Sequence, residues 1–276
     1  MGAADSLNRS SSPMLKAVLW DVDGTLAETE RDGHLVAFNQ AFEELALPWR
    51  WSQARYGELL HVSGGRERLA HDLQSQPSAP RDSAERAALV ERIHRLKNEL
   101  YARIVVTGAL PLRGGVAELL QECRQAKLQI GIATTTSEAN VAALLGAQLG
   151  ADWRATFDVV VCAEQAPRKK PDPQVYQYAL RALHRAGHEV LAIEDAPAGV
   201  AAARAAGIAV LVVRSLYFPD GAVDDAIAVG SSLARTEGWQ PPAQDRPDSR
   251  IHLRQLLDWH RRWWDARANH RGSVSR

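Results

Sequence analysis

The sequence predicts an α/β fold, with a doubly wound parallel sheet as the core and an all-helical cap inserted into it. Three features of the chain predict this fold class. A short apolar strand near the N-terminus ends in acidic residues, residues 29–107 carry only helical periodicity, and residues 112–213 alternate helices with short apolar strands. Strands separated by helices of about 10 to 15 residues are typical of right-handed crossovers and a parallel sheet.

Composition restricts the class of protein. The 276-residue chain is long enough for one large or two modest domains, and its 46% hydrophobic and 24% charged residues are ordinary for a globular protein. Basic and acidic residues both number 33, so net charge predicts no attraction to nucleic acid or to membranes. No apolar stretch approaches the ~20 residues that span a bilayer. Cys123 and Cys162 form no CxxC pair, which favours buried free thiols and a cytoplasmic location.

The N-terminal strand organises the chain. Residues 1–13 have no hydrophobic core of a secretory signal, and we expect them to be a disordered leader. Val18, Leu19 and Trp20 then predict a buried strand that stops at the turn from Asp21 to Thr25. Two carboxylates in one tight turn repel each other and raise each other's pKa. The turn therefore indicates a divalent cation or phosphate chemistry.

The next segment predicts a helical cap. Helices are expected at residues 29–47, 49–62, 66–76 and 83–105, with a break at Ser63, Gly64 and Gly65. No strand is predicted between residues 29 and 107. We therefore assign residues 28–108 to the cap, and residues 14–27 together with 109–235 to the core.

The remaining core predicts four more strands, which makes five with the first. Strands are expected at residues 128–133, 157–162, 190–193 and 208–213, and helices at residues 115–126, 138–149, 173–186 and 198–206. Ligands of such sheets bind outside the carboxyl ends of the strands. Asp21 ends the first strand, Thr134 the second, and Glu194 and Asp195 the fourth, while Lys170 follows the third after a short loop.

The C-terminal extension, residues 236–276, predicts one helix. Its apolar residues from Ile251 to Trp263 form a single helical stripe, which favours a helix packed on the core with its arginines in solvent. Arginine mixed with tryptophan also occurs in nucleic-acid-binding segments. We expect no nucleic-acid partner.

Motifs at the strand ends resemble those of the haloacid dehalogenase (HAD) superfamily of phosphotransferases, which has a Rossmannoid core. The apolar strand followed by DxDGT resembles motif I, Thr134 motif II, Lys170 with Pro171 motif III, and Glu194 with Asp195 motif IV. The strings AETERDGHLVAFNQAF and SGGRERL, with tryptophans between them, more closely resemble the CbbY-like phosphatases within the β-phosphoglucomutase-like group. That family is linked to carbon fixation and hydrolyses xylulose 1,5-bisphosphate, an inhibitor of Rubisco.

The resemblance implies a set of catalytic groups. Asp21 would be the nucleophile that forms an aspartyl phosphate, and Asp23 the general acid and base. Thr134 and Lys170 would bind the phosphoryl group. Mg²⁺ would be held by Asp21, the backbone carbonyl of Asp23, Glu194 and Asp195, and hard oxygen ligands suit this ion.

Substrate-binding residues are expected on both sides of the site. Glu28 and His34 lie just past the hinge, where the chain passes from the core into the cap, and would reach sugar hydroxyls. Arg66 would hold the distal phosphate of a bisphosphate in a bidentate fork. The remaining candidates are Gly64, Gly65, Thr135 and Thr136.

The expected function is a magnesium-dependent sugar-bisphosphate phosphatase whose partner is a small phosphorylated sugar, most closely xylulose 1,5-bisphosphate. A sugar phosphomutase uses the same aspartyl phosphate but transfers the phosphoryl group to a second sugar, and the sequence does not separate the two. A non-catalytic phospholigand-binding protein would be expected to lack Asp21, Asp23 or Lys170, and all three are present. The oligomeric state is not predicted.

Overall fold

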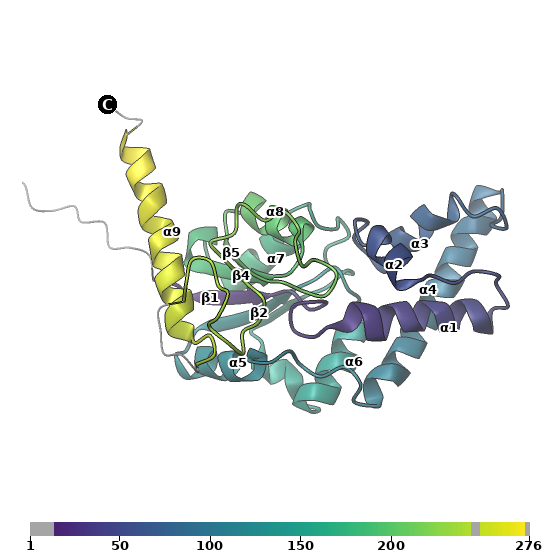
Figure 1. Cartoon of the computed structure of the whole chain (residues 1–276), viewed down its shortest axis with the longest axis horizontal. Helices are drawn as coiled ribbons and strands as arrows, with labels where there is room; N and C mark the ends of the chain where they lie inside the picture. The colour runs from purple at the N-terminus through teal and green to yellow at the C-terminus, as the bar shows by residue number, and fades with distance from the viewer. Residues whose placement is uncertain (1–13, 244–248, 274–276) are drawn as a thin grey trace, which may run out of the picture.

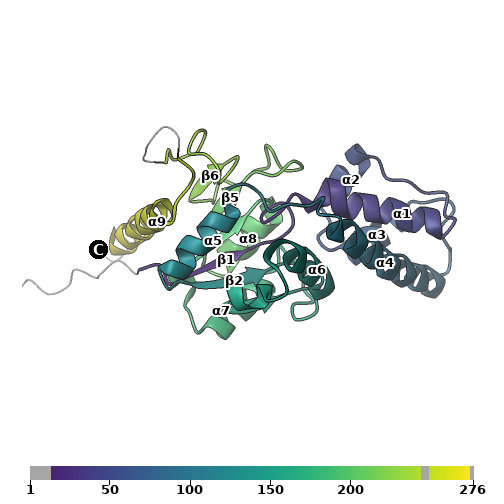
Figure 2. The ribbon, with the colours of Figure 1, turned by 90° about the horizontal axis from the view of Figure 1, so that it is seen from below.

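A computed structural model describes residues 14–243 and 249–273. A sheet core and a cap of helices lie side by side, and the C-terminal helix lies at the end of the core that is far from the cap (Figure 1). A view turned by 90° shows the same separation (Figure 2). The predicted leader, residues 1–13, lies outside the described residues.

The sheet has six parallel strands in the order β3-β2-β1-β4-β5-β6. They are β1 Ala17–Trp20, β2 Gln129–Ala133, β3 Val159–Val161, β4 Val190–Glu194, β5 Ala209–Val213 and β6 Ala228–Gly230. The direction of winding reverses between β1 and β4, so the doubly wound fold is confirmed and its ligand-binding switch point lies at these two strands. The prediction of five strands was wrong, because it relied on the alternation of helices with strands and no helix precedes the short edge strand β6 after β5.

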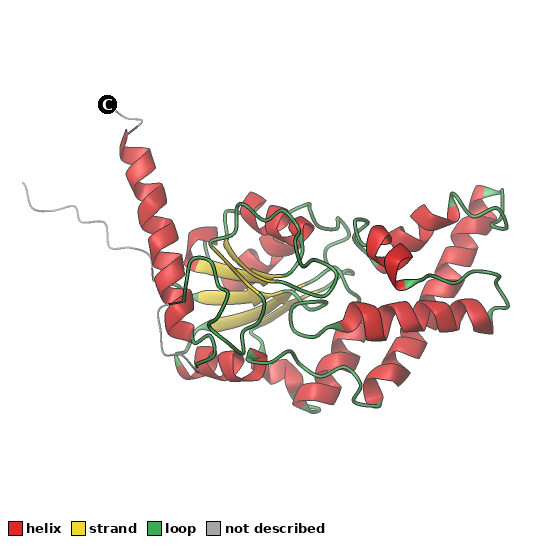
Figure 3. Ribbon diagram, viewed as in Figure 1, coloured by secondary structure: helices red, strands yellow, loops and turns green. Residues whose placement is uncertain are grey.

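Helices cover both faces of the sheet, which Figure 3 shows as strands between helices. Val18 and Trp20 belong to one buried cluster, and Ala17 and Leu19 to another, as the two-residue repeat of a strand requires. The first cluster includes α5 (Val116–Gln125), α6 (Glu138–Leu149) and α9 (Leu253–Ser273); the second includes α7 (Gln174–Leu183) and α8 (Pro197–Ala205). Burial on both faces explains why the strands are continuous apolar runs.

The cap is all-helical, as predicted. Its elements are a π-helix at Glu30–Leu35, then α1 Val36–Glu44, α2 Gln53–Leu59, α3 Gly65–Leu73 and α4 Ser83–Val106. Trp49 and Trp51 are buried and meet Phe42 edge-on, so they build the core of the cap. The helix α4 packs against both α1 and α6 and therefore joins the cap to the sheet core.

The C-terminal helix is amphipathic, as predicted. Leu253, Leu256 and Trp259 of α9 are buried, whereas Arg261 and Arg262 are exposed. Cys123 and Cys162 are buried free thiols, which confirms that prediction. No helix among the described residues combines the length and the apolar character needed to cross a membrane.

Candidate active site

Four charged side chains meet at the carboxyl edge of the sheet, at its switch point. Asp21 follows β1, Glu194 ends β4, and Asp195 comes directly after it. Lys170 Nζ lies 2.6 Å from Asp21 Oδ1 and 2.6 Å from Glu194 Oε1. One carboxylate oxygen each from Asp21, Glu194 and Asp195 lies within 4.8 Å of the others. The four groups are called the acidic cluster below.

The acidic cluster carries more negative than positive charge in a buried place. Burial raises the pKa of Asp21 to about 7, and Lys170 opposes this rise. Burial and the charges of Asp21 and Glu194 also raise the pKa of Asp195 well above its ordinary value. Lys170 remains protonated, because its two carboxylate partners outweigh burial and raise its pKa. Three carboxylates facing one ammonium fit a hard divalent cation with oxygen ligands, and Mg²⁺ is such a cation.

The turn after β1 brings the cluster together. Gly24 has a φ of +83°, and a Cβ there would lie 2.1 Å from Asp195 Oδ2. Only glycine accepts both the left-handed backbone and this close approach.

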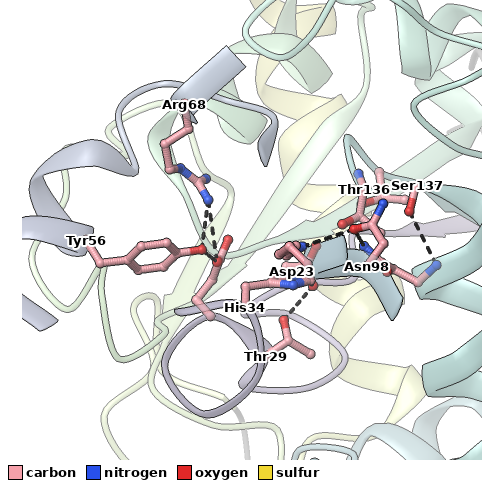
Figure 4. A network of polar contacts seen from close by, with 12 residues as sticks. Asp23, Thr29, His34, Tyr56, Arg68, Asn98, Thr136 and Ser137 are labelled. Carbon is pink, nitrogen blue, oxygen red and sulfur yellow. Dashed lines mark hydrogen bonds and ion pairs between the residues drawn. The ribbon is translucent and has the colours of Figure 1, made fainter. Parts of the chain in front are cut away.

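Asp23 is bound by the first turn of the cap. Its Oδ1 accepts a hydrogen bond from Thr29 Oγ1 and lies 2.9 Å from His34 Nε2; Figure 4 shows the three side chains pointing toward one another. Burial favours neutral Asp23, but the charge of His34 and these hydrogen bonds prevail and hold its pKa well below the ordinary value. The His34 ring also stacks on Tyr101, with centroids 4.3 Å apart. Its predicted contact with a sugar hydroxyl stays a prediction.

Two adjoining cavities open between the cap and the core. The acidic cluster, Thr134 and Glu28 line a cavity of about 360 Å³, which we call the cluster cavity. A second cavity of about 150 Å³ is called the cationic cavity after its four Lys and Arg side chains, Arg66, Arg68, Lys97 and Lys169. Its lining also includes four carboxylates, Asp23, Glu30, Glu67 and Glu164, and His94, Gly64, Gly65 and Thr136. Both cavities reach Asp23, Glu30 and Thr135. One elongated ligand can therefore occupy both.

The predicted substrate-binding residues lie around these cavities. Thr136 N donates to Thr134 Oγ1 at 3.2 Å, so the Thr134 hydroxyl keeps its own proton to donate. Glu28 Oε1 lies 3.5 Å from Arg113 Nε at the hinge. Arg66 is about half exposed at the cavity rim, with its Nε 2.8 Å from Glu91 Oε1.

Several residues of the site were missed by the sequence reasoning. Arg68 donates to Tyr56 OH at 2.8 Å, and Tyr56 donates to Glu30. Figure 4 shows the Arg68 guanidinium pointing toward the Tyr56 hydroxyl. Lys97 is 3% exposed, and burial lowers its pKa to about 8. The sequence did hold a sign of this residue, because Lys97 falls among the apolar core positions of α4. Lysine is almost never fully buried unless its charge has a partner, so such a position indicates a functional site.

Comparisons with known proteins agree with the motifs. The model of the haloacid dehalogenase-like hydrolases matches residues 15–207. Protein CbbY of Cupriavidus necator is 42% identical over 249 residues, which are 89% of this chain and 97% of that protein. The CBBY-like protein of Arabidopsis thaliana is 34% identical, over 83% of this chain and 72% of that protein. A mutant CbbY from Rhodobacter sphaeroides, solved with xylulose-(1,5)bisphosphate, is 37% identical with a TM-score of 0.76, covering 81% and 97% of the two chains.

Proposed function

Because the chain belongs to the haloacid dehalogenase-like hydrolases and is a phosphatase, we propose that it is a magnesium-dependent sugar-bisphosphate phosphatase. Its proposed reaction is the hydrolysis of xylulose 1,5-bisphosphate to xylulose 5-phosphate and phosphate. The observation that carries the proposal is the pair of adjoining cavities, one lined by the acidic cluster and the other offering four Lys and Arg side chains, with carboxylates beside them, to a second phosphate. A mutant of the similar CbbY from Rhodobacter sphaeroides was solved in complex with xylulose-(1,5)bisphosphate, which has a phosphate at each end.

We assign the nucleophile to Asp21. Its carboxylate oxygen attacks phosphorus while the bond from phosphorus to the sugar oxygen breaks, which gives an aspartyl phosphate. Lys170, 2.6 Å away, favours the ionised nucleophile and pairs with the phosphoryl oxygens. The Thr134 hydroxyl, whose oxygen already accepts from Thr136 N, donates to a phosphoryl oxygen.

Asp23 serves as the acid and then as the base. It protonates the departing sugar oxygen, and it later takes a proton from the water that attacks phosphorus and frees Asp21. Thr29 and His34 hold Asp23 ionised in this arrangement. These contacts must therefore change before Asp23 can deliver a proton.

The proposed ligands of Mg²⁺ are Asp21, Glu194, Asp195 and the backbone carbonyl of Asp23. The buried excess of carboxylates supports this assignment. The ion, when bound, would neutralise negative charge on the phosphoryl group during its transfer.

The cationic cavity is the proposed site of the second phosphate. Arg66 supplies a guanidinium fork from the cap, and this phosphate would compete with Glu91 for it. Lys169 reaches the cavity from the core side, and the backbone at Gly64 and Gly65 permits close approach. Glu28 and His34 remain the proposed contacts to the sugar, with Thr135 and Thr136 beside them.

Replacement of the nucleophile tests the proposal. Asp21→Asn is expected to lower phosphate release from xylulose 1,5-bisphosphate by at least about three orders of magnitude while the protein stays folded. Circular dichroism checks the fold, and calorimetry checks that the variant still binds the bisphosphate. A variant that keeps most of its turnover contradicts the assignment. Stoichiometric conversion of a sugar 1-phosphate to its 6-phosphate by the wild type would identify a phosphomutase instead.

We also propose a cytoplasmic location, which the two buried free thiols support. A role in carbon fixation is proposed on the similarity to CbbY proteins.

A further inference from the structure

Tyr176 contacts Glu194 of the acidic cluster and takes no part in the proposed catalytic steps. Its side chain is fully buried on α7, and its hydroxyl donates to Glu194 Oε1. The same oxygen lies 2.6 Å from Lys170 Nζ. Lys170 Nζ also lies 5.3 Å from the centroid of the Tyr176 ring. Tyr176 and Lys170 therefore hold one oxygen of Glu194 together.

The rest of the Glu194 carboxylate packs against the start of α8. A Cβ on Gly199 would lie 2.0 Å from Glu194 Oε2, so glycine lets the helix backbone approach the carboxylate closely. The carboxylate cannot tilt toward α8, and its Oε1 is held by two donors. This leaves Glu194 one narrow range of orientations.

We propose that Tyr176 is a positioning residue that fixes the Glu194 carboxylate for a divalent cation. A neutral donor suits this task, because a second cation beside Glu194 would repel the metal. The carboxylate oxygen of Glu194 can only accept a hydrogen bond, so the Tyr176 hydroxyl is the donor in this contact. Hydrogen bonds from residues that do not themselves contact the metal orient the side chains that do. Their loss commonly weakens metal binding about 10- to 100-fold.

The inference rests on the proposed Mg²⁺ site, and Tyr176→Phe tests it. Phenylalanine keeps the ring beside Lys170 and removes only the hydroxyl. Tyr178→Phe is the matched control, because Tyr178 lies on the same helix but is 37% exposed and its ring contacts Arg181. Isothermal titration of the phosphate-free protein with MgCl₂ measures the affinity, and thermal unfolding in EDTA measures the stability of each variant.

We expect Tyr176→Phe to weaken Mg²⁺ binding about tenfold or more, and Tyr178→Phe to leave it unchanged. Turnover of Tyr176→Phe should return to within a few-fold of wild type at saturating Mg²⁺. If the wild type binds Mg²⁺ and Tyr176→Phe binds it equally well, the inference is wrong even if thermal stability has fallen. Equal weakening of Mg²⁺ binding in Tyr176→Phe and Tyr178→Phe also overturns the inference. A wild type without measurable Mg²⁺ binding contradicts the proposed metal site itself, which separates that failure from the failure of this inference.

Discussion

Magnesium affinity should fall steeply when the pH is lowered from 8 to 5.5. The cause is Asp21, whose pKa is raised to about 7 by burial and whose ionised carboxylate the proposed Mg²⁺ site requires. A group with this pKa is roughly 90% ionised at pH 8 and roughly 3% ionised at pH 5.5. Competition from this one proton therefore weakens binding about 30-fold, or about 2 kcal/mol. The raised pKa of Asp195 acts in the same direction.

The metal-free protein should show the opposite trend in stability. A carboxyl group whose pKa is higher in the folded state stabilises the fold below its unfolded value of 3.8, and this contribution is lost as the pH rises through about 7. Thermal unfolding in EDTA from pH 4 to pH 8 measures this loss, and added Mg²⁺ should stabilise the protein most at pH 8.

Calorimetry gives the sharpest assay of this prediction. Titration with MgCl₂ at pH 5.5 in two buffers of different ionisation enthalpy counts the protons released on binding, and we expect about one or more. Asp21→Asn is the control, because it removes the proton that Asp21 contributes. An affinity that differs less than twofold between pH 5.5 and pH 8, with no proton released, would refute the reasoning.

Three substitutions, one of them with a matched control, test other parts of the account. Gly24→Ala should weaken Mg²⁺ binding at least about tenfold, because the new Cβ would lie 2.1 Å from Asp195 Oδ2; calorimetry measures this, and unchanged binding would contradict the turn geometry. Leu256→Ala should cost about 2 to 5 kcal/mol of unfolding free energy in denaturant titrations, whereas Leu257→Ala at a 37% exposed position should cost much less. Arg66→Ala should lower kcat/KM for a sugar bisphosphate at least about tenfold more than for a monophosphate, as measured by phosphate release. Equal losses for the two substrates would mean that Arg66 has a structural role and does not bind the second phosphate.

The sheet core and the acidic cluster were predictable because local patterns specify them. Apolar runs predicted the first five strands, and parallel strands place their carboxyl ends at one edge. That rule brings Lys170 to Asp21, although 149 residues separate them in the sequence. The roles of these groups in catalysis came from the resemblance and stay predictions.

Other contacts left no pattern in the sequence. Arg113, which lies where the chain returns from the cap to the core, donates to the backbone carbonyls of Gly24, Val213, Arg214 and Ser231, and any residue type supplies a carbonyl. Tyr176 lies in the apolar stripe of α7, as a core residue does, and only the tertiary fold, in which α7 packs against β2 and β3, brings its hydroxyl to Glu194. The π-helix at Glu30–Leu35, which brings His34 to Asp23, was predicted as ordinary helix because its residues give no local sign of a wider turn.

The most direct test of the account compares phosphate release, with Mg²⁺ present and at equal concentration, from xylulose 1,5-bisphosphate, ribulose 1,5-bisphosphate, 2-phosphoglycolate and β-glucose 1-phosphate. The two adjoining cavities predict that the two bisphosphates are hydrolysed in preference to the two monophosphates. The proposed function, which rests on the similarity to CbbY, predicts that xylulose 1,5-bisphosphate is the preferred bisphosphate. Release from none of the four, with β-glucose 1-phosphate converted to the 6-phosphate, would contradict the phosphatase and make the protein a mutase.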